Sequence, residues 1–288
     1  MKLNIFKKCL TATAIAAAVA APLPASASVV DAWQLTLSAL NGLNIGGAGA
    51  IVGATDATNI DHLVINGKST INQTVVGGSA LGQSFTDSGY LQFLANSRES
   101  GGAVVNLNFG TAGGNALFGY LQFTGLTGVL NSNGSITFNP GSGTVGFFVE
   151  DDGDLISSTG NVLQVSSYKV IAPSGGSNLD FFGGTAANST VDVTLELLSE
   201  IVPNLFANAG GGAMSLMNLH LVNVDSLLDP NFKQNPDNTG VVGGNGTSVI
   251  HVQNAGQYNV TTVPEPGSLA LLGIGLAGFG FMRRRKSS

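Results

Sequence analysis

Cysteine is almost absent from this chain of 288 residues, in which Cys9 is the only one. It lies at the start of an uncharged apolar run, Cys9–Leu23, close to the N-terminus. The rest of the chain has no thiol at all. Disulfides therefore cannot stabilise it, and a cysteine cannot serve as its nucleophile.

Basic residues are scarce in the middle of the chain. Between Ser28 and Val263 there are four, against sixteen Asp and Glu, which gives a net charge of about −12, whereas the whole chain carries −6. A body this acidic excludes nucleic-acid binding by counterion release. It is also repelled by other polyanions unless divalent cations bridge the two.

Common spacings of catalytic and metal-binding residues are missing as well. The chain contains no H-x-H, H-E-x-x-H, C-x-x-C or G-x-S-x-G pattern, and its histidines, His62, His220 and His251, are far apart. We therefore expect no catalytic residues and a protein that is not an enzyme. The alternative is a secreted hydrolase that uses two carboxylates on facing strands, for which any of the acids qualifies.

Three segments follow one another at the N-terminus. A short basic head, Met1–Lys8, precedes the apolar run, and Ala25 and Ala27 then place small residues at the two positions that a signal peptidase reads. This order is typical of a secretory signal peptide. We assign residues 1–27 to it and expect cleavage before Ser28, so signal peptidase and the secretion machinery are expected partners.

The C-terminus carries a similar arrangement. Pro264, Glu265 and Pro266 precede fifteen uncharged residues, 268–282, and the basic residues Arg283, Arg284, Arg285 and Lys286 come next. A membrane span needs about 17 to 20 apolar residues, so this segment crosses only with help from snorkelling basic side chains. The positive-inside rule then holds the basic end in the cytoplasm and the body outside.

These C-terminal parts together resemble the PEP-CTERM sorting signal of Gram-negative bacteria. The resemblance covers residues 264–288 and implies that exosortase, a membrane processing enzyme, recognises Pro264, Glu265 and Pro266. It further implies removal of the transmembrane helix and the basic tail, so anchoring in the inner membrane is transient. The alternative is a plain C-terminal anchor that happens to contain Pro-Glu-Pro.

The body between the two ends has the pattern of an all-β protein. Val191–Leu197 alternates apolar and polar residues, as a half-buried strand does. Similar segments separated by short glycine-bearing turns predict an antiparallel β-sandwich or a stacked β-sheet domain over residues 28–253. Residues 254–263 are predicted to form a polar stalk between this domain and the sorting signal.

Two local patterns predict how strands meet. Asn66-Gly67 lies between two strand-like segments and predicts a type I′ hairpin, since both residues tolerate positive φ. Gly89–Phe93 reads GYLQF and recurs thirty residues later as Gly119–Phe123. The repeat favours two neighbouring strands that use the same core chemistry over a ligand-binding repeat.

The densest group of charges contains Glu150, Asp151, Asp152 and Asp154. Closely spaced carboxylates suit calcium, which is available outside the cell, although the spacing is not that of an EF-hand loop. The alternative is a solvated acidic turn with Asp-Gly at its tip. We expect no other cofactor.

The body resembles the flocculation-associated PEP-CTERM proteins in three segments, Asp31–Leu35, Asn59–Leu63 and Gly82–Gly89. The resemblance implies a protein of the cell surface or extracellular matrix that promotes flocculation and biofilm formation by association with exopolysaccharide. Its many Asn, Ser and Thr side chains offer hydrogen bonds to sugars, and calcium is able to bridge its carboxylates to an acidic polysaccharide.

Overall fold

The computed structural model describes residues 32–97, 107–153, 160–176, 188–209, 217–228 and 245–262. All of them except Thr262 belong to one compact unit, Val29–Thr261. The segments Met1–Ser28 and Thr262–Ser288 are grouped as a second unit. The predicted signal peptide and sorting signal therefore lie outside the described residues.

Strands make up most of the described chain, and its helical elements are two short 3₁₀ turns, η1 (Leu37–Leu40) and η2 (Gly46–Ala48). The strands are β1 (Trp33–Leu35), β2 (Ala57–Ile60), β3 (His62–Val75), β4 (Gln83–Ser97), β5 (Thr111–Ala112), β6 (Asn115–Ala116), β7 (Phe118–Leu130), β8 (Ile136–Phe138), β9 (Thr144–Glu150), β10 (Val162–Gly176), β11 (Asn188–Glu200), β12 (Phe206–Asn208), β13 (Met217–Leu228) and β14 (Gly246–Thr262). The prediction of an all-β protein is confirmed.

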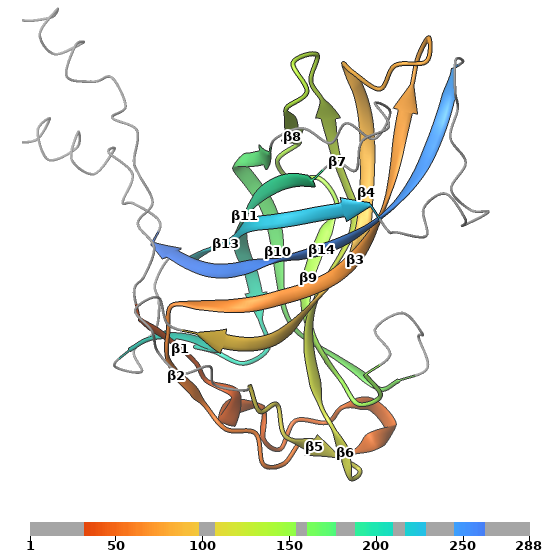
Figure 1. Ribbon diagram of the computed structural model, residues 1–288. Coiled ribbons are helices and arrows are strands. Elements are labelled where there is room, and N and C mark those ends of the chain that lie inside the picture. Colours follow the sequence, from red (N-terminus) through yellow and green to blue (C-terminus); the bar gives the residue numbers. More distant parts are fainter. Residues whose placement is uncertain are drawn as a thin grey trace, which may run out of the picture. The chain divides into compact units, whose positions relative to one another are not determined.

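The nine-stranded main sheet closes on itself. Its strands follow the order β11-β13-β14-β3-β4-β7-β8-β10-β9, and additional pairings join β11 to β10 and β7 to β9. The ring therefore runs from β3 through β4, β7, β9, β10, β11, β13 and β14 back to β3, and β8 pairs with both β7 and β10 (Figure 1). The pairings with a described register are antiparallel, as predicted, and closure gives the sheet one shared interior.

Strand β3 shows why the sequence forms this sheet. Its residues alternate between buried and more exposed positions, with Leu63, Ile65, Ile71 and Val75 turned to the interior. It pairs along its length with β14 on one side and β4 on the other. A strand that is bonded on both sides and apolar on one face is held in register by its own pattern, because a slip of one residue would expose all these side chains.

An aromatic cluster fills one region of the core. Trp33, Phe206 and Tyr258 are packed against one another with ring centroids 5.9 to 6.5 Å apart. Phe93 meets Tyr258 edge-on at 5.4 Å and Phe147 at 5.2 Å. Since Trp33 and Phe206 lie on β1 and β12, the cluster joins the three-stranded sheet β12-β1-β2 to the closed sheet.

The hairpin predicted at Asn66-Gly67 is wrong, because β3 runs straight through both residues. Gly67 instead lets two backbones approach closely, since a Cβ placed there would lie 1.9 Å from the carbonyl oxygen of Tyr90. An Asn-Gly pair has this second use in a strand interior, where a missing side chain makes room for a neighbouring strand.

The polar stalk predicted for residues 254–263 is also wrong as far as the described residues reach. Strand β14 continues to Thr262, and Tyr258 and Val260 in it are fully buried. The register runs on from Asn254, opposite Gly67, to Tyr258, opposite Leu63. The segment thus forms a strand because its apolar residues at alternate positions are buried, although most of its other residues are polar.

The GYLQF repeat forms a symmetric pair, as its interpretation as two neighbouring strands predicts. Strands β4 and β7 run antiparallel, and Leu91 lies opposite Leu121. Each repeat turns its Leu and its Phe to the interior, where Leu91, Phe93, Leu121 and Phe123 are all buried. The two copies therefore build matching parts of one wall.

Within the described residues, helices of the length and apolar character needed to cross a bilayer are absent. The C-terminal helix predicted for residues 268–282 lies outside that part of the chain.

Candidate functional site

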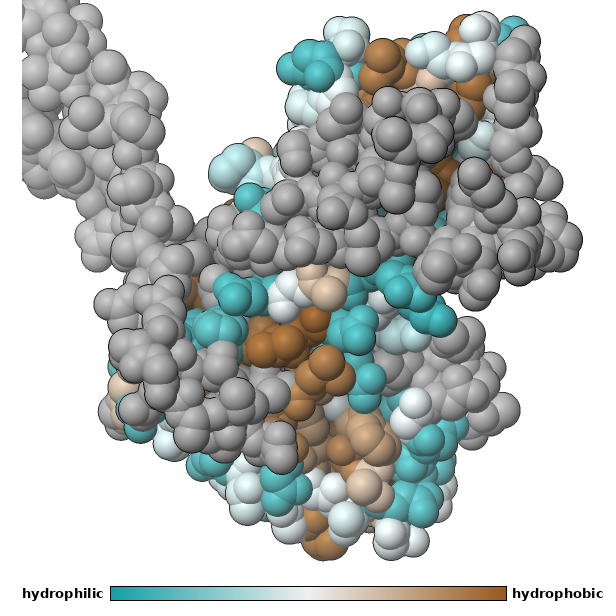
Figure 2. Space-filling model, in the orientation of Figure 1, coloured by the Kyte–Doolittle hydropathy of each residue, from teal (hydrophilic) through white to brown (hydrophobic). Residues whose placement is uncertain are grey.

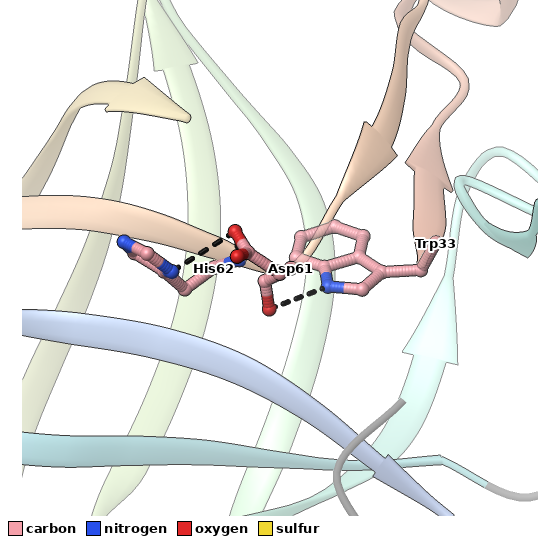
Figure 3. Close-up of polar contacts among 3 residues, drawn as sticks. All are labelled: Trp33, Asp61 and His62. Atoms are coloured by element: carbon pink, nitrogen blue, oxygen red, sulfur yellow. Dashed lines mark hydrogen bonds and ion pairs between the residues drawn. The ribbon is translucent and has the colours of Figure 1, made fainter. Parts of the chain in front are cut away.

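Two of the three segments that resemble flocculation-associated proteins meet at a corner of the fold. Asp61 is the one residue between β2 and β3, and its backbone carbonyl accepts a hydrogen bond from the Trp33 indole N–H at 3.1 Å (Figure 3). Its carboxylate Oδ1 accepts the His62 backbone N–H at 2.7 Å and lies 2.9 Å from His62 Nδ1. A carboxylate that bonds the next residue in this way fixes the chain direction at a turn.

The contacts at this corner stabilise the fold. The Asp61 and His62 side chains are 8% and 13% exposed, and Trp33 is fully buried in the aromatic cluster. Among the described residues, the second carboxylate oxygen of Asp61 has no hydrogen-bond partner. The contacts of Asp61 hold β1, β2 and β3 together where the chain passes from the small sheet into the closed sheet.

The acidic residues that are predicted to bind calcium lie in different surroundings. Glu150 ends β9 and is buried, whereas the Asp151 carboxylate accepts bonds from the backbone N–H and the side-chain amide of Asn161, at 2.7 and 2.9 Å. The Asn161 bonds lower the pKa of Asp151, although burial opposes them. Asp152 is exposed, and Asp154 lies outside the described residues. The described part of the chain contains no group of three or more His, Cys, Asp or Glu side chains that could hold a metal ion. Calcium binding at this segment stays a prediction.

The histidines are placed separately as far as they are described. His62 pairs with Asp61, and His251 lies on β14 with its Nδ1 3.0 Å from the Thr70 hydroxyl on β3. His220 lies on β13, whose side chains are outside the described set.

A cavity inside the closed sheet is a feature that the sequence patterns did not indicate. Its volume is about 70 Å³, and apolar side chains of β3, β4, β7, β8, β9, β11 and β14 form most of its wall. Ser69, Gln73, Asp87 and Asn254 form its polar part. An aspartate at an inward position of β4, two residues after the buried Phe85, is the signal that could have revealed it.

Asp87 is the unusual residue of this cavity. Burial raises its pKa to about 7, against bonds from the Ser69 hydroxyl and the Ser88 backbone N–H that lower it. The residue as a whole is half-buried, but its Oδ1 is inaccessible and has no hydrogen-bond partner among the described residues. Asp87 also lies in Gly82–Gly89, the third segment that resembles flocculation-associated proteins.

The outer face of the closed sheet carries polar and aromatic side chains in register. One row across β14, β3, β4 and β7 consists of Gln253, Lys68, Tyr90 and Gln122. The next row runs across β14, β3, β4, β7 and β9 and consists of Ala255, Asn66, Gln92, Tyr120 and Phe148. We refer to these two sets as the outer rows.

The outer rows differ in exposure from β3 to β9. Asn66, Lys68 and Gln122 are exposed, and Tyr90 and Gln92 are half-buried. Tyr120 is buried and stacks on Phe148 with ring centroids 5.5 Å apart and an interplanar angle of 19°. Burial and the charges of Glu150 and Asp152 raise the pKa of Tyr120 to about 12, so its hydroxyl stays neutral at physiological pH.

Polar and apolar groups also lie next to each other elsewhere on the surface. On the face drawn in Figure 2, hydrophilic side chains border a strip of hydrophobic ones in the lower half of the view. Large apolar residues that remain exposed include Val52, Leu94, Val162 and Leu198. The surface thus exposes both hydrogen-bonding groups and apolar area.

Comparison with known proteins shows that the C-terminal residues match a known sorting motif. The family model of the PEP-CTERM protein-sorting motif matches residues 262–286. The chain is thus an exported protein that is targeted to exosortase and processed by it, and its precursor is anchored in the membrane. No curated protein and no solved structure matches the chain.

Proposed function

We propose that the processed protein works at the cell surface or in the extracellular matrix, where it promotes flocculation and biofilm formation by binding exopolysaccharide. It acts by association and not by catalysis. In this proposal the signal peptide, residues 1–27, and the tail that ends in Arg283–Lys286 serve export and sorting, and the closed sheet is the part that functions outside.

The outer rows are the observation that carries this proposal. They present amide and hydroxyl groups, which both donate and accept hydrogen bonds, at the regular spacing of neighbouring strands. Tyr90 adds an aromatic ring, whose apolar face suits the C–H groups of a sugar and whose hydroxyl suits its oxygens. A face of this composition fits an extended, uncharged or weakly charged polysaccharide chain.

The charge of the body adds a condition. With about four cations against sixteen acids between Ser28 and Val263, the protein repels an acidic polysaccharide in the absence of divalent ions. We propose that calcium bridges the two, with Glu150–Asp154 as the candidate segment on the protein. Removal of calcium with a chelator is then expected to weaken binding to an acidic polymer but not to a neutral one.

The test is co-sedimentation of the secreted protein with the exopolysaccharide of the strain that produces it. The variant Asn66→Ala/Gln92→Ala/Gln122→Ala removes three amides from the outer rows and is expected to lower the affinity at least about tenfold, since each net hydrogen bond contributes about 1 kcal/mol. The matched control is Thr137→Ala/Asn139→Ala, two exposed polar residues on and after β8 that are outside the outer rows. Its affinity is expected to equal that of the unaltered protein.

Two results would contradict the proposal. Unchanged sedimentation of the triple variant would remove the outer rows from the binding surface. Progressive shortening of the polymer during incubation would favour the hydrolase alternative instead.

A further inference from the structure

The interior of the closed sheet contains a polar site that the packing of the fold does not explain. The cavity is bounded by buried apolar side chains, among them Phe85, Leu121, Phe138 and Val193, and Asp87 lines it from β4. Ionised carboxylates are rarely buried without a partner, because removal from water costs free energy that only a cation or several donors can offset. Asp87 has an oxygen to which no described residue donates.

The neighbours of Asp87 leave its surroundings rich in acceptors. The Asn254 side-chain amide donates to the Ser69 hydroxyl at 3.2 Å, and the Ser69 hydroxyl in turn bonds Asp87. The Gln73 amide nitrogen donates to the backbone carbonyls of Thr74 and Ser84, at 2.9 and 3.1 Å. These donors are therefore engaged within the protein, and Gln73 can offer a ligand only its oxygen.

The described cations do not neutralise Asp87. Lys68 lies on the outer face of β3, and Lys169 on β10 pairs with Glu196 at 3.0 Å, with side chains 41% and 44% exposed. Among the described residues that line the cavity, Asp87 is the one titratable group. Its charge thus lacks a counter-ion within the described part of the cavity.

We propose that this cavity binds a small organic ammonium compound, whose cationic group donates to Asp87 Oδ1 and whose apolar body contacts the surrounding Phe, Leu and Val side chains. An ammonium group has three donors and no acceptor, which complements a carboxylate and a carboxamide oxygen. An apolar cavity of about 150 Å³ holds benzene, whereas this one measures about 70 Å³, so it suits a short alkyl chain of about two carbons and not a ring. This site faces the interior and is separate from the outer rows.

The test is calorimetric titration of the secreted protein with three two-carbon probes: ethylammonium, ethanol and acetate. At pH 8, ethylammonium is expected to bind at least about tenfold more tightly than the other two. Asp87→Asn keeps the shape of the side chain and is expected to abolish this preference, whereas the charge control Glu196→Gln, on an exposed acid, leaves it unchanged. Equal binding of all three probes, unaltered ethylammonium binding to Asp87→Asn, or no binding of ethylammonium would each overturn the proposal.

A second measurement keeps the proposal open to refutation if Asp87→Asn does not fold. The affinity of the unaltered protein for ethylammonium is expected to fall at least about fivefold between pH 8 and pH 5.5, because the carboxyl becomes protonated while the amine stays charged. An affinity that does not change over this range would rule out Asp87 as the partner of the ammonium group.

Discussion

Phe93 and Asp87 lie on the same strand, β4, and face the same interior, yet their surroundings differ. Phe93 is 5% exposed and meets Phe147 and Tyr258 edge-on. Asp87 borders a cavity and has a carboxylate oxygen without a partner among the described residues. One region of the interior is thus a close-packed aromatic core, while the other keeps space and an uncompensated polar group.

The aromatic region thus contributes to the stability of the sheet, whereas the region around Asp87 has the chemistry of a binding site. Aromatic rings in edge-to-face contact stabilise the fold beyond the area they bury. A buried carboxylate without a counter-ion lowers stability, so its presence is better explained by a ligand than by packing. We expect substitutions in the two regions to have different sizes and, for Asp87, a different sign.

The largest expected effect is the loss of an aromatic ring from the close-packed region. Phe93→Ala is expected to lower the free energy of unfolding by about 3–5 kcal/mol, since it removes buried area and leaves a void among rigid neighbours. Phe85→Ala, at the cavity, is expected to cost less, because Phe85 already borders empty space. Chemical denaturation of both variants measures the comparison, which fails if Phe85→Ala costs as much as Phe93→Ala.

The second effect depends on pH and concerns Asp87. Its pKa is about 7 in the folded protein against 3.8 for an ordinary aspartate, so the folded state takes up a proton at higher pH than the unfolded state does. The stability contribution of Asp87 therefore falls as the pH rises from about 4 to 7 and stays low above that.

The same denaturation experiment isolates this contribution. Relative to Asp87→Asn, the unaltered protein is expected to lose about 2–3 kcal/mol of unfolding free energy between pH 5 and pH 8, because one unit of pKa corresponds to about 1.4 kcal/mol. If the difference between the two proteins is the same at both pH values, the Asp87 carboxyl is not buried as described.

A smaller effect is expected where β3 and β4 approach closely. Gly67→Ala places a Cβ 1.9 Å from the Tyr90 carbonyl oxygen, so the strands must separate, at a cost of about 1–3 kcal/mol. Asn66→Ala, at the exposed neighbouring position, is the control and is expected to change stability by less than about 0.5 kcal/mol. Thermal unfolding of both variants decides the matter, and equal melting temperatures would contradict the close approach.

The smallest effect is expected outside both interior regions. Lys169→Ala removes the ion pair with Glu196, whose partners are 41% and 44% exposed. Exposed pairs contribute about 0–1 kcal/mol, and salt screens them. A loss greater than about 1 kcal/mol in moderate salt would show that the outer face adds more to stability than this comparison allows.

Local patterns in the sequence predicted the class of fold well. The alternation in Val191–Leu197 falls within β11, and the GYLQF repeat gives two paired strands, because inward and outward positions are set by neighbouring residues alone. The PEP-CTERM tail was likewise readable, since its parts follow one another directly in the chain.

Features that depend on distant partners were not predictable in this way. Asn66-Gly67 suits a turn locally, and only the pairing of β3 with both β14 and β4 keeps it extended. The polar composition of residues 254–262 suggested a stalk, although the buried Tyr258 belongs to the aromatic cluster. Closure of the sheet and the cavity around Asp87 likewise arise from strands far apart in the chain.

Export and processing are what place the closed sheet outside the cell, where the proposed binding takes place. Intact-mass measurement of the protein recovered from the culture medium and the matrix tests this claim. The expected product begins at Ser28 and lacks Arg283–Lys286. A protein found in the cytosol with both ends intact would contradict the account.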